Sequence, residues 1–184
     1  SSWNAWTGHR ENGRCCAPRG ICHTKLIEVG MTASNFTIRV YGLLIHGRGG
    51  HGEPHVLVAD ELIKGQRVTK FPGGGLEYGE GLKDCLVREI REEIGVEAYD
   101  VQHFYTTDFF QQSAFHSKPL QVLSVYFTFR VREPDTIPVV IEPFTGISGP
   151  GDQEAFRWLR LRGSKEDDLS LPIDRVVWRM LVEQ

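Results

Sequence analysis

The stretch FPGGGLEYGEGLKDCLVREIREEIGV, residues 71–96, joins a glycine-rich turn to an acidic segment. Pro72 and the three glycines after it predict a turn, because the interior of a helix or a strand tolerates them poorly. Apolar side chains then recur at four-residue steps, as in a helix with one buried face. These side chains are Leu82, Leu86, Ile90 and Ile94. Gly95 fits the left-handed cap at the end of such a helix.

Three glutamates crowd one part of this predicted helix. Residues three and four apart are neighbours on a helix, so Glu89 lies beside both Glu92 and Glu93. Such crowding of like charges is destabilising, and a bound cation would explain it. Oxygen-only ligand sets suit hard divalent cations, Mg²⁺ above all and Mn²⁺ as a substitute. Arg88 lies four residues before Glu92 and can orient that carboxylate. The other interpretation is a solvated helix face laced with salt bridges.

The full spacing favours the metal interpretation. Five residues separate the first fixed glycine from a glutamate, and seven more separate that glutamate from an Arg-Glu pair. The fixed positions are Gly74, Glu80, Arg88, Glu89, Glu92, Glu93 and Gly95, with aliphatic residues at 90 and 96. In every fixed position this pattern resembles the motif of the Nudix hydrolase family. The resemblance is specific over residues 71–96, and the remaining order of elements agrees with it.

The resemblance implies an enzyme that cleaves a phosphoanhydride bond in a nucleoside diphosphate linked to another moiety. It also implies an α/β/α sandwich on a mixed sheet (fold class α/β, or α+β) and one to three Mg²⁺ or Mn²⁺ ions. The implied metal ligands are Glu89, Glu92, Glu93 and the carbonyl of Gly74, with one glutamate also deprotonating water. Glu80 would hold the turn and a water molecule, and Arg88 would orient a glutamate. Divalent cations neutralise a diphosphate and acidify water, which suits this reaction.

The composition of the chain argues against several other classes of protein. The 184 residues suffice for one domain with a sizeable core, and the net charge of −3 argues against binding a nucleic acid polymer. No apolar run approaches the roughly 20 residues of a membrane span. Four cysteines, one of them Cys85 within the predicted helix, suggest reduced thiols and therefore a cytoplasmic location.

Residues 1–34 lack periodicity and are expected to form a disordered or non-native extension, with residues 35–184 forming one domain. Cys15, Cys16, Cys22 and His23 lie within nine residues, a spacing that matches no standard zinc site. Met31 is our hypothesis for the natural start of the chain, because regular patterning begins just after it.

Alternating patterns predict strands at 36–45, 54–60, 100–107, 120–131 and 156–159, and Pro172 opens a predicted C-terminal helix. We expect Val176, Val177, Met180 and Leu181 to form its buried side. Arg39 and Tyr41 share one face of the first strand, where Arg39 could grip a phosphate or be an ordinary exposed arginine. Glu154 could be a further catalytic or metal-binding acid, with Asp152 competing for that role, or a solvated surface acid.

Several aromatic side chains could stack on a base, although at strand spacing we expect most to be core: Tyr105, Phe109, Phe110, Phe115 and Phe127. His116 and Lys118 could contact a substrate from the loop at 111–119. Features of members acting on ADP-ribose or NADH are absent, which favours nucleoside triphosphates, sugar nucleotides or dinucleoside polyphosphates. The expected partner is thus a small nucleotide, and a homodimer stays open. The alternative function is a nucleotide-binding sensor module without important catalysis.

Overall fold

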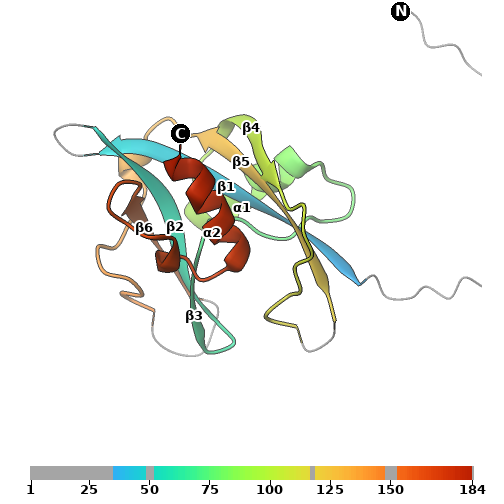
Figure 1. Cartoon of the computed structure of the whole chain (residues 1–184). Coiled ribbons are helices and arrows are strands. Elements are labelled where there is room, and N and C mark those ends of the chain that lie inside the picture. Colours follow the sequence, from blue (N-terminus) through green and yellow to red (C-terminus); the bar gives the residue numbers. More distant parts are fainter. Residues whose placement is uncertain (1–34, 49–51, 117–118, 148–152, 184) are drawn as a thin grey trace, which may run out of the picture. The chain divides into compact units, whose positions relative to one another are not determined.

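A computed structural model describes residues 35–48, 52–116, 119–147 and 153–183, which belong to one compact unit, Ala33–Gln184. Six strands and two α-helices form this unit (Figure 1). In chain order they are β1 Phe36–Arg48, β2 Glu53–Ile63, β3 Gln66–Lys70, α1 Leu82–Ile94, β4 Tyr99–Thr106, β5 Gln121–Arg130, β6 Glu154–Arg160 and α2 Pro172–Val182, with 3₁₀ turns at Pro134–Thr136 and Glu166–Asp168. The expected N-terminal extension, with its cysteine cluster and Met31, lies outside the described residues.

The sheet is mixed, because β1 runs parallel to β5 while the other strand pairs are antiparallel. β2 pairs along one edge with β6, from His55 to Glu61. Its other edge pairs first with β1, as far as Val56, and then with β3, from Ala59 onward. β1 and β3 therefore diverge along the same edge of β2. The chain leaving β3 enters the space that opens between them.

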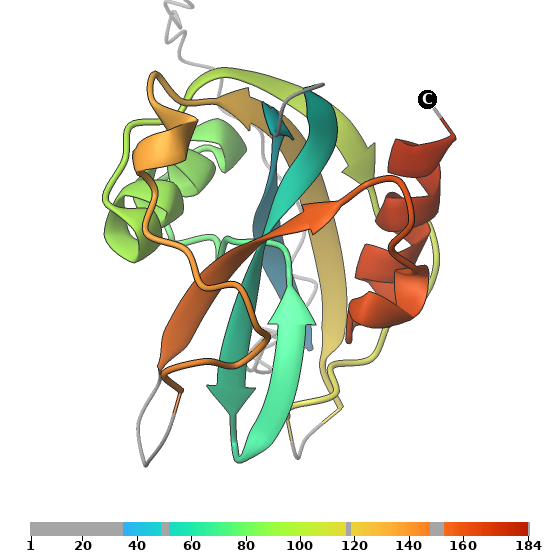
Figure 2. The same ribbon diagram turned by 90° about the vertical axis from the view of Figure 1, so that its left-hand side faces the viewer.

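The sheet separates two apolar layers, one under each helix (Figure 2). Alternate residues of a strand point to opposite faces. Val40 accordingly packs with α1 residues such as Leu86 and Ile90, whereas Tyr41 packs with α2 residues such as Val177. This arrangement confirms the predicted α/β/α sandwich with a mixed sheet.

Some boundaries and burial predictions were wrong. β2 extends to Ile63 rather than ending at 60, and β3 was not foreseen as a strand. Met180 on α2 is exposed, because Trp178 and Leu181 already cover the sheet there. Phe109 and Phe110 are also exposed, since they lie in the loop after β4 rather than on a strand.

Asp174 is a fully buried acid that ties α2 to the rest of the fold. The Tyr126 hydroxyl donates to Asp174 Oδ1 (2.5 Å), and the Phe71 amide donates to Oδ2 (3.3 Å). Burial raises the pKa of Asp174 to about 7, although both donors favour its ionised form. Through Asp174, helix α2 thus holds Phe71, the residue from which the glycine turn starts.

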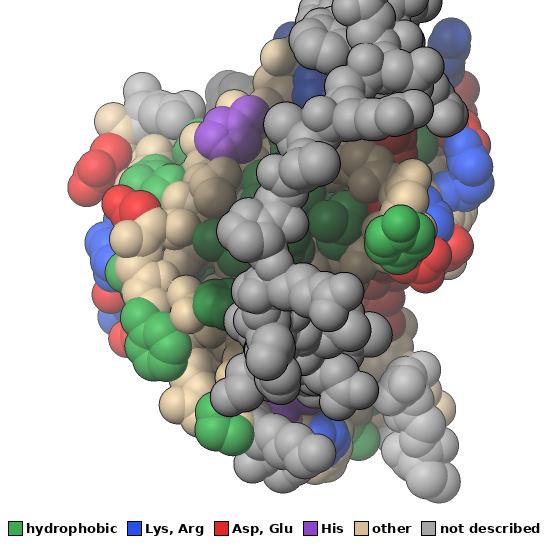
Figure 3. Space-filling view, turned by 90° about the vertical axis from the view of Figure 1, so that its right-hand side faces the viewer, with side chains coloured by type: hydrophobic (Ala, Val, Ile, Leu, Met, Phe, Trp, Pro, Cys, Tyr) green, Lys and Arg blue, Asp and Glu red, His purple; other side chains and the backbone are tan. Residues whose placement is uncertain are grey.

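On the face of the molecule shown in Figure 3, hydrophobic side chains stand among polar and charged ones. Within the described ranges, neither helix has the length and apolar character needed to cross a bilayer.

Replacing Tyr126 by Phe should lower the free energy of unfolding by about 1–3 kcal/mol, because a buried carboxyl loses a donor. The folded-state pKa of Asp174, about 7, lies above the usual value of an aspartate. The burial of Asp174 therefore lowers the free energy of unfolding progressively as pH rises from about 4 to 7, and the full decrease is present above that range. The substitution should consequently cost more at about pH 8.5 than at about pH 5.5, as measured by urea unfolding.

Tyr105→Phe provides the matched control, because Tyr105 donates to Asp108 in an exposed hydrogen bond (2.6 Å). This variant should lose less stability, with little dependence on pH. Equal losses for Tyr126→Phe at both pH values would contradict the role given to Asp174.

Candidate active site

The glycine turn after β3 lies against β1 as if it were another strand. Three backbone hydrogen bonds fix it there: Val40 N to Gly74 O (2.8 Å), Gly42 N to Pro72 O (2.9 Å) and Leu76 N to Ile38 O (3.0 Å). Gly74 O keeps a lone pair beyond its bond to Val40. The turn thus fills the space between β1 and β3 and carries backbone carbonyls to the start of the acidic helix.

Two glycines of the turn are required by their surroundings. Gly73 has φ +130°, and a Cβ there would lie 2.2 Å from the Val40 carbonyl oxygen. A Cβ on Gly74 would lie 2.3 Å from the Glu89 carboxylate. Gly75 differs, because a Cβ there would meet nothing within 4 Å. The first two glycines therefore let the backbone approach β1 and α1 closely.

Arg88 joins the turn to three glutamates. Its Nε and Nη2 donate to the two oxygens of Glu80 (3.0 and 2.6 Å), and Nη1 donates to Glu89 (2.8 Å) and Glu92 (3.2 Å). Nη2 also donates to Gly75 O (3.1 Å). The hydrogen bonds from Arg88 lower the pKa of Glu80 to about 2, with help from the Glu77 amide. Arg88 is therefore placed to orient these carboxylates, as the sequence predicts, and the Glu92 side chain turns mostly to solvent.

A second acidic group lies deeper, where α1 meets the ends of β2 and β6. Glu61, Glu93 and Glu154 each place a carboxylate oxygen within 4.8 Å of the others; we call these three residues the acidic cluster. Glu61 and Glu154 are cross-strand partners on β2 and β6. Glu93 comes from α1, and its Oε2 accepts the Gly73 amide (3.0 Å). Three distant segments thus converge on one point beside the glycine turn.

Two members of the acidic cluster, Glu93 and Glu154, hold their protons more tightly than free glutamates do. Burial raises the pKa of Glu154 to about 9, and the charge of Glu93 adds to this effect. Burial also raises the pKa of Glu93. Glu154 Oε1 is buried without a hydrogen-bond partner among the described residues. Glu154 is therefore not the solvated surface acid that the sequence left open, whereas Asp152, its competitor, lies outside the described residues.

Sequence reasoning missed Glu61 and Lys70. The predicted strand ended one residue before Glu61, and Lys70 was not among the candidate site residues. Lys70 is almost wholly buried, and its ammonium lies 2.6 Å from Glu61 Oε1. An acidic residue at the end of an apolar strand was the available signal for Glu61. Nothing local distinguished Lys70, because its charged partner, Glu61, lies on a different strand.

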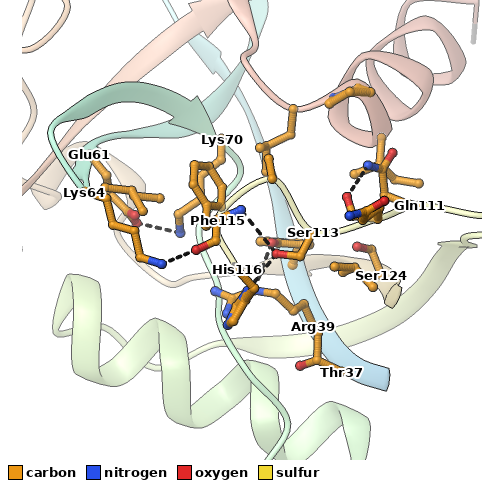
Figure 4. A pocket seen from close by; sticks show the side chains of 18 residues that line it. Thr37, Arg39, Glu61, Lys64, Lys70, Gln111, Ser113, Phe115, His116 and Ser124 are labelled. Carbon is orange, nitrogen blue, oxygen red and sulfur yellow. Dashed lines mark hydrogen bonds and ion pairs between the residues drawn. The ribbon is translucent and has the colours of Figure 1, made fainter. Parts of the chain in front are cut away.

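A cavity of about 420 Å³ adjoins the acidic cluster (Figure 4). Its walls combine apolar residues such as Ile63 and Ile173 with polar ones such as Gln111. A smaller cavity, about 350 Å³, is lined by Gly74, Glu89 and the acidic cluster. Four residues line both cavities, and three of them are charged: Arg39, Glu61, Ile63 and Lys70. The two cavities are therefore adjacent and share a charged boundary.

Arg39 lies at this boundary, where the sequence placed a candidate phosphate ligand. Its Nε donates to the Tyr41 hydroxyl (3.1 Å), and its guanidinium carbon lies 5.8 Å from the centre of the Tyr41 ring. No carboxylate forms an ion pair with Arg39 within the described part of the chain. Tyr41 itself is buried. Arg39 therefore brings a positive charge to the cavity, with Glu89 and Glu61 near enough to interact with that charge but not in an ion pair with it.

The remaining sequence candidates divide between cavity and core. Phe115 and His116 line the larger cavity, from the loop before β5. Phe127 is a core residue, as expected, and Tyr105 packs at the edge of the α2 core. Lys118 lies outside the described residues. The loop residues at 111–116 thus stay candidates for contact with a ligand.

The NUDIX domain family model matches residues 37–175, most of the chain. This chain belongs to the NUDIX domain family. Solved structures with a similar fold include the E. coli ORF135 protein, at 19% identity over 82% of this chain and 91% of that one, with a TM-score of 0.52. A NUDIX hydrolase from Nitrosomonas europaea is 17% identical over 79% and 88% (TM-score 0.52). A MutT NUDIX hydrolase from Burkholderia pseudomallei is 18% identical over 78% and 96% (TM-score 0.50). At these identities the likeness concerns the fold.

The contrast between Gly74 and Gly75 in this Nudix domain gives a testable prediction. Gly74→Ala should weaken Mg²⁺ binding by at least about tenfold, because the new methyl group displaces the Glu89 carboxylate from the site. Titration calorimetry with Mg²⁺ measures this directly. Gly75→Ala, one residue along the same turn, should stay within about twofold of the wild-type affinity because its Cβ has open space. Equal effects of the two substitutions would refute the proposed placement of Glu89.

Proposed function

We propose that this protein is a divalent-metal-dependent hydrolase that cleaves a phosphoanhydride bond in a nucleoside diphosphate linked to another moiety. One observation carries the proposal most strongly. In a Nudix domain with every fixed motif residue in place, the acidic cluster borders a cavity into which Arg39 brings a positive charge that forms no ion pair among the described residues. Carboxylates for a metal and a cation for phosphate are thus adjacent, as phosphoryl chemistry requires.

The available donors fit Mg²⁺, with Mn²⁺ as an alternative. They are all oxygens: the acidic cluster, Glu89 and the free lone pair of the Gly74 carbonyl. The buried Glu154 Oε1 without a hydrogen-bond partner supports a cation at this point, because such an oxygen is costly to leave unsatisfied. A bound divalent cation withdraws charge from the diphosphate and acidifies water. Glu92, directed mostly to solvent, is the least favoured of the ligands expected from the motif.

The chain's own groups then position the substrate. Arg39 can donate from both terminal nitrogens to phosphate oxygens, since Tyr41 engages only its Nε. Arg88 keeps Glu80 and Glu89 oriented. Burial raises the pKa of Glu93, which favours this residue over the more exposed Glu92 as a proton acceptor.

The larger cavity is the proposed site for the nucleoside. Its volume of about 420 Å³ and its mixture of apolar and amide side chains suit a group of that size. Nucleoside triphosphates, sugar nucleotides and dinucleoside polyphosphates remain the candidate substrates. A cytoplasmic location and a homodimer stay predictions.

Glu93→Gln should reduce metal-dependent hydrolysis by at least about a hundredfold, because a ligand and proton acceptor is lost. The measurement is release of phosphate or nucleoside monophosphate from a panel of the three candidate substrate classes with Mg²⁺ or Mn²⁺. Glu97→Gln is the control, because Glu97 is an exposed glutamate paired with Arg91.

Tight nucleotide binding without turnover of any panel member would favour the sensor module instead. Full activity of Glu93→Gln would refute the assigned role of that residue.

The pH dependence of Mg²⁺ binding tests Glu154 separately. Its pKa of about 9 means that, in the metal-free protein, it is protonated at neutral pH. A metal ligand must be ionised, so binding releases this proton and apparent affinity rises with pH until about pH 9, by up to tenfold per pH unit. Glu154→Gln should weaken binding and flatten this rise, as measured by calorimetry, whereas Glu97→Gln should keep it. An unchanged slope in Glu154→Gln would exclude Glu154 as a ligand.

A further inference from the structure

Lys70 is a buried lysine among carboxylates, and the Nudix motif assigns it no role. Its side chain is only 4% exposed and its ammonium lies 2.6 Å from Glu61 Oε1. The same nitrogen donates to the Gly73 carbonyl (3.1 Å) and lies 5.9 Å from the centre of the Tyr41 ring. Figure 4 shows it on β3, directed toward Glu61 at the edge of the larger cavity.

Its partners are the elements that build the acidic cluster. Glu61 belongs to the cluster, and Gly73 donates its own amide to Glu93. Gly73 is therefore held from two sides: Lys70 donates to its carbonyl, and Glu93 accepts from its amide. Burial alone would lower the pKa of Lys70, but the charges of Glu93 and Glu61 outweigh this and raise it. The ammonium stays charged because the carboxylates surround it.

The cluster needs such a charge when no metal is bound. Ionised carboxylates whose oxygens lie within 4.8 Å of one another repel strongly in a poorly solvated site, and at neutral pH the proton kept by Glu154 relieves this only in part. A buried ion pair with one partner removed leaves an uncompensated charge, which is far more costly than the pair. Among the described residues, Lys70 is the cation in direct contact with the cluster, since Arg39 pairs with none of its members.

We propose that Lys70 is the resident counterion of the acidic cluster: it offsets the carboxylates in the metal-free protein, positions Glu61 and the glycine turn, and thereby limits the affinity for a divalent cation. This inference rests on the proposed function. It makes Lys70 a positioning residue rather than a catalytic one. A cation bound at the cluster must share the carboxylates with the ammonium, so Lys70 weakens Mg²⁺ binding. The same ammonium keeps the site folded and assembled before the cation binds.

Two effects of opposite sign follow for Lys70→Met, which keeps the length of the side chain and removes its charge. The Kd for Mg²⁺ should fall by at least about threefold, because a competing positive charge is gone. The kcat should fall by at least about tenfold, because Glu61 and the Gly73 carbonyl lose the group that holds them. Calorimetry gives the first value, and turnover at saturating Mg²⁺ gives the second.

Tighter metal binding together with slower turnover is the distinguishing result. A packing defect would weaken both, and unchanged or weaker Mg²⁺ binding in a folded Lys70→Met protein would overturn the proposal. Lys83→Met, a change of an exposed lysine on α1, should alter neither value.

A second variant covers the case in which Lys70→Met does not fold. Lys70→Met combined with Glu61→Gln removes both charges of the pair and should fold, because no uncompensated carboxylate is left in that pair. If the double variant also fails to fold with Mg²⁺ present, Lys70 is a packing residue and the proposal is wrong. Failure of the proposed function is separate, because it would appear as wild-type protein that neither binds Mg²⁺ nor turns over any substrate.

Discussion

The hydrogen bond from Val40 to the Gly74 carbonyl fixes the point on which the site depends. It holds a turn against the middle of β1, in the space where β1 and β3 part along one edge of β2. Gly73 is required there because a Cβ would enter the β1 backbone, whereas a Cβ on Gly74 would displace the Glu89 carboxylate. The close approach of turn, strand and helix is what brings α1 glutamates beside residues of β2 and β6. The sheet therefore acts as the frame that sets distances between charges.

Electrostatics imposes the second constraint. A site able to bind a divalent cation must gather carboxylates, and gathering them costs stability while the cation is absent. Two basic side chains, Arg88 and Lys70, reduce this cost in different parts of the site. Arg88 compensates the outer glutamates near solvent, where its guanidinium also holds the loop at Gly75. Lys70 compensates the inner group, where burial makes an unpaired carboxylate much more expensive. Arg88 and Lys70 also donate hydrogen bonds to carbonyls of the glycine turn, at Gly75 and Gly73 respectively. The same two side chains therefore compensate the carboxylates and hold the turn in place.

The sequence was most informative where function requires fixed spacing within one segment. The helix, its apolar stripe at Leu86 and Ile90, its Gly95 cap and the box glutamates could all be predicted, because their partners lie within a few residues of one another. Glu61, Lys70 and Asp174 could not. Their roles arise from contacts with residues in other strands and helices, such as Glu61 with Glu154 across β2 and β6. A buried acid on α2 also contradicts helix patterning, and only its contacts to Tyr126 and Phe71 explain it.

The same reasoning separates the chemistry from the recognition of substrate. In the proposed function, the Nudix motif would determine the bond that is broken, because Gly74, Arg88 and the α1 glutamates belong to one turn and helix. Recognition of the proposed substrate would depend on side chains from β1, β3 and the loop at 111–116, which converge only through the tertiary fold. Arg39, Glu61 and Lys70 line both cavities, so a change in any of them would alter the proposed phosphate and nucleoside sites together. Under the proposed function, specificity would therefore be coupled to metal affinity through the charges at that boundary.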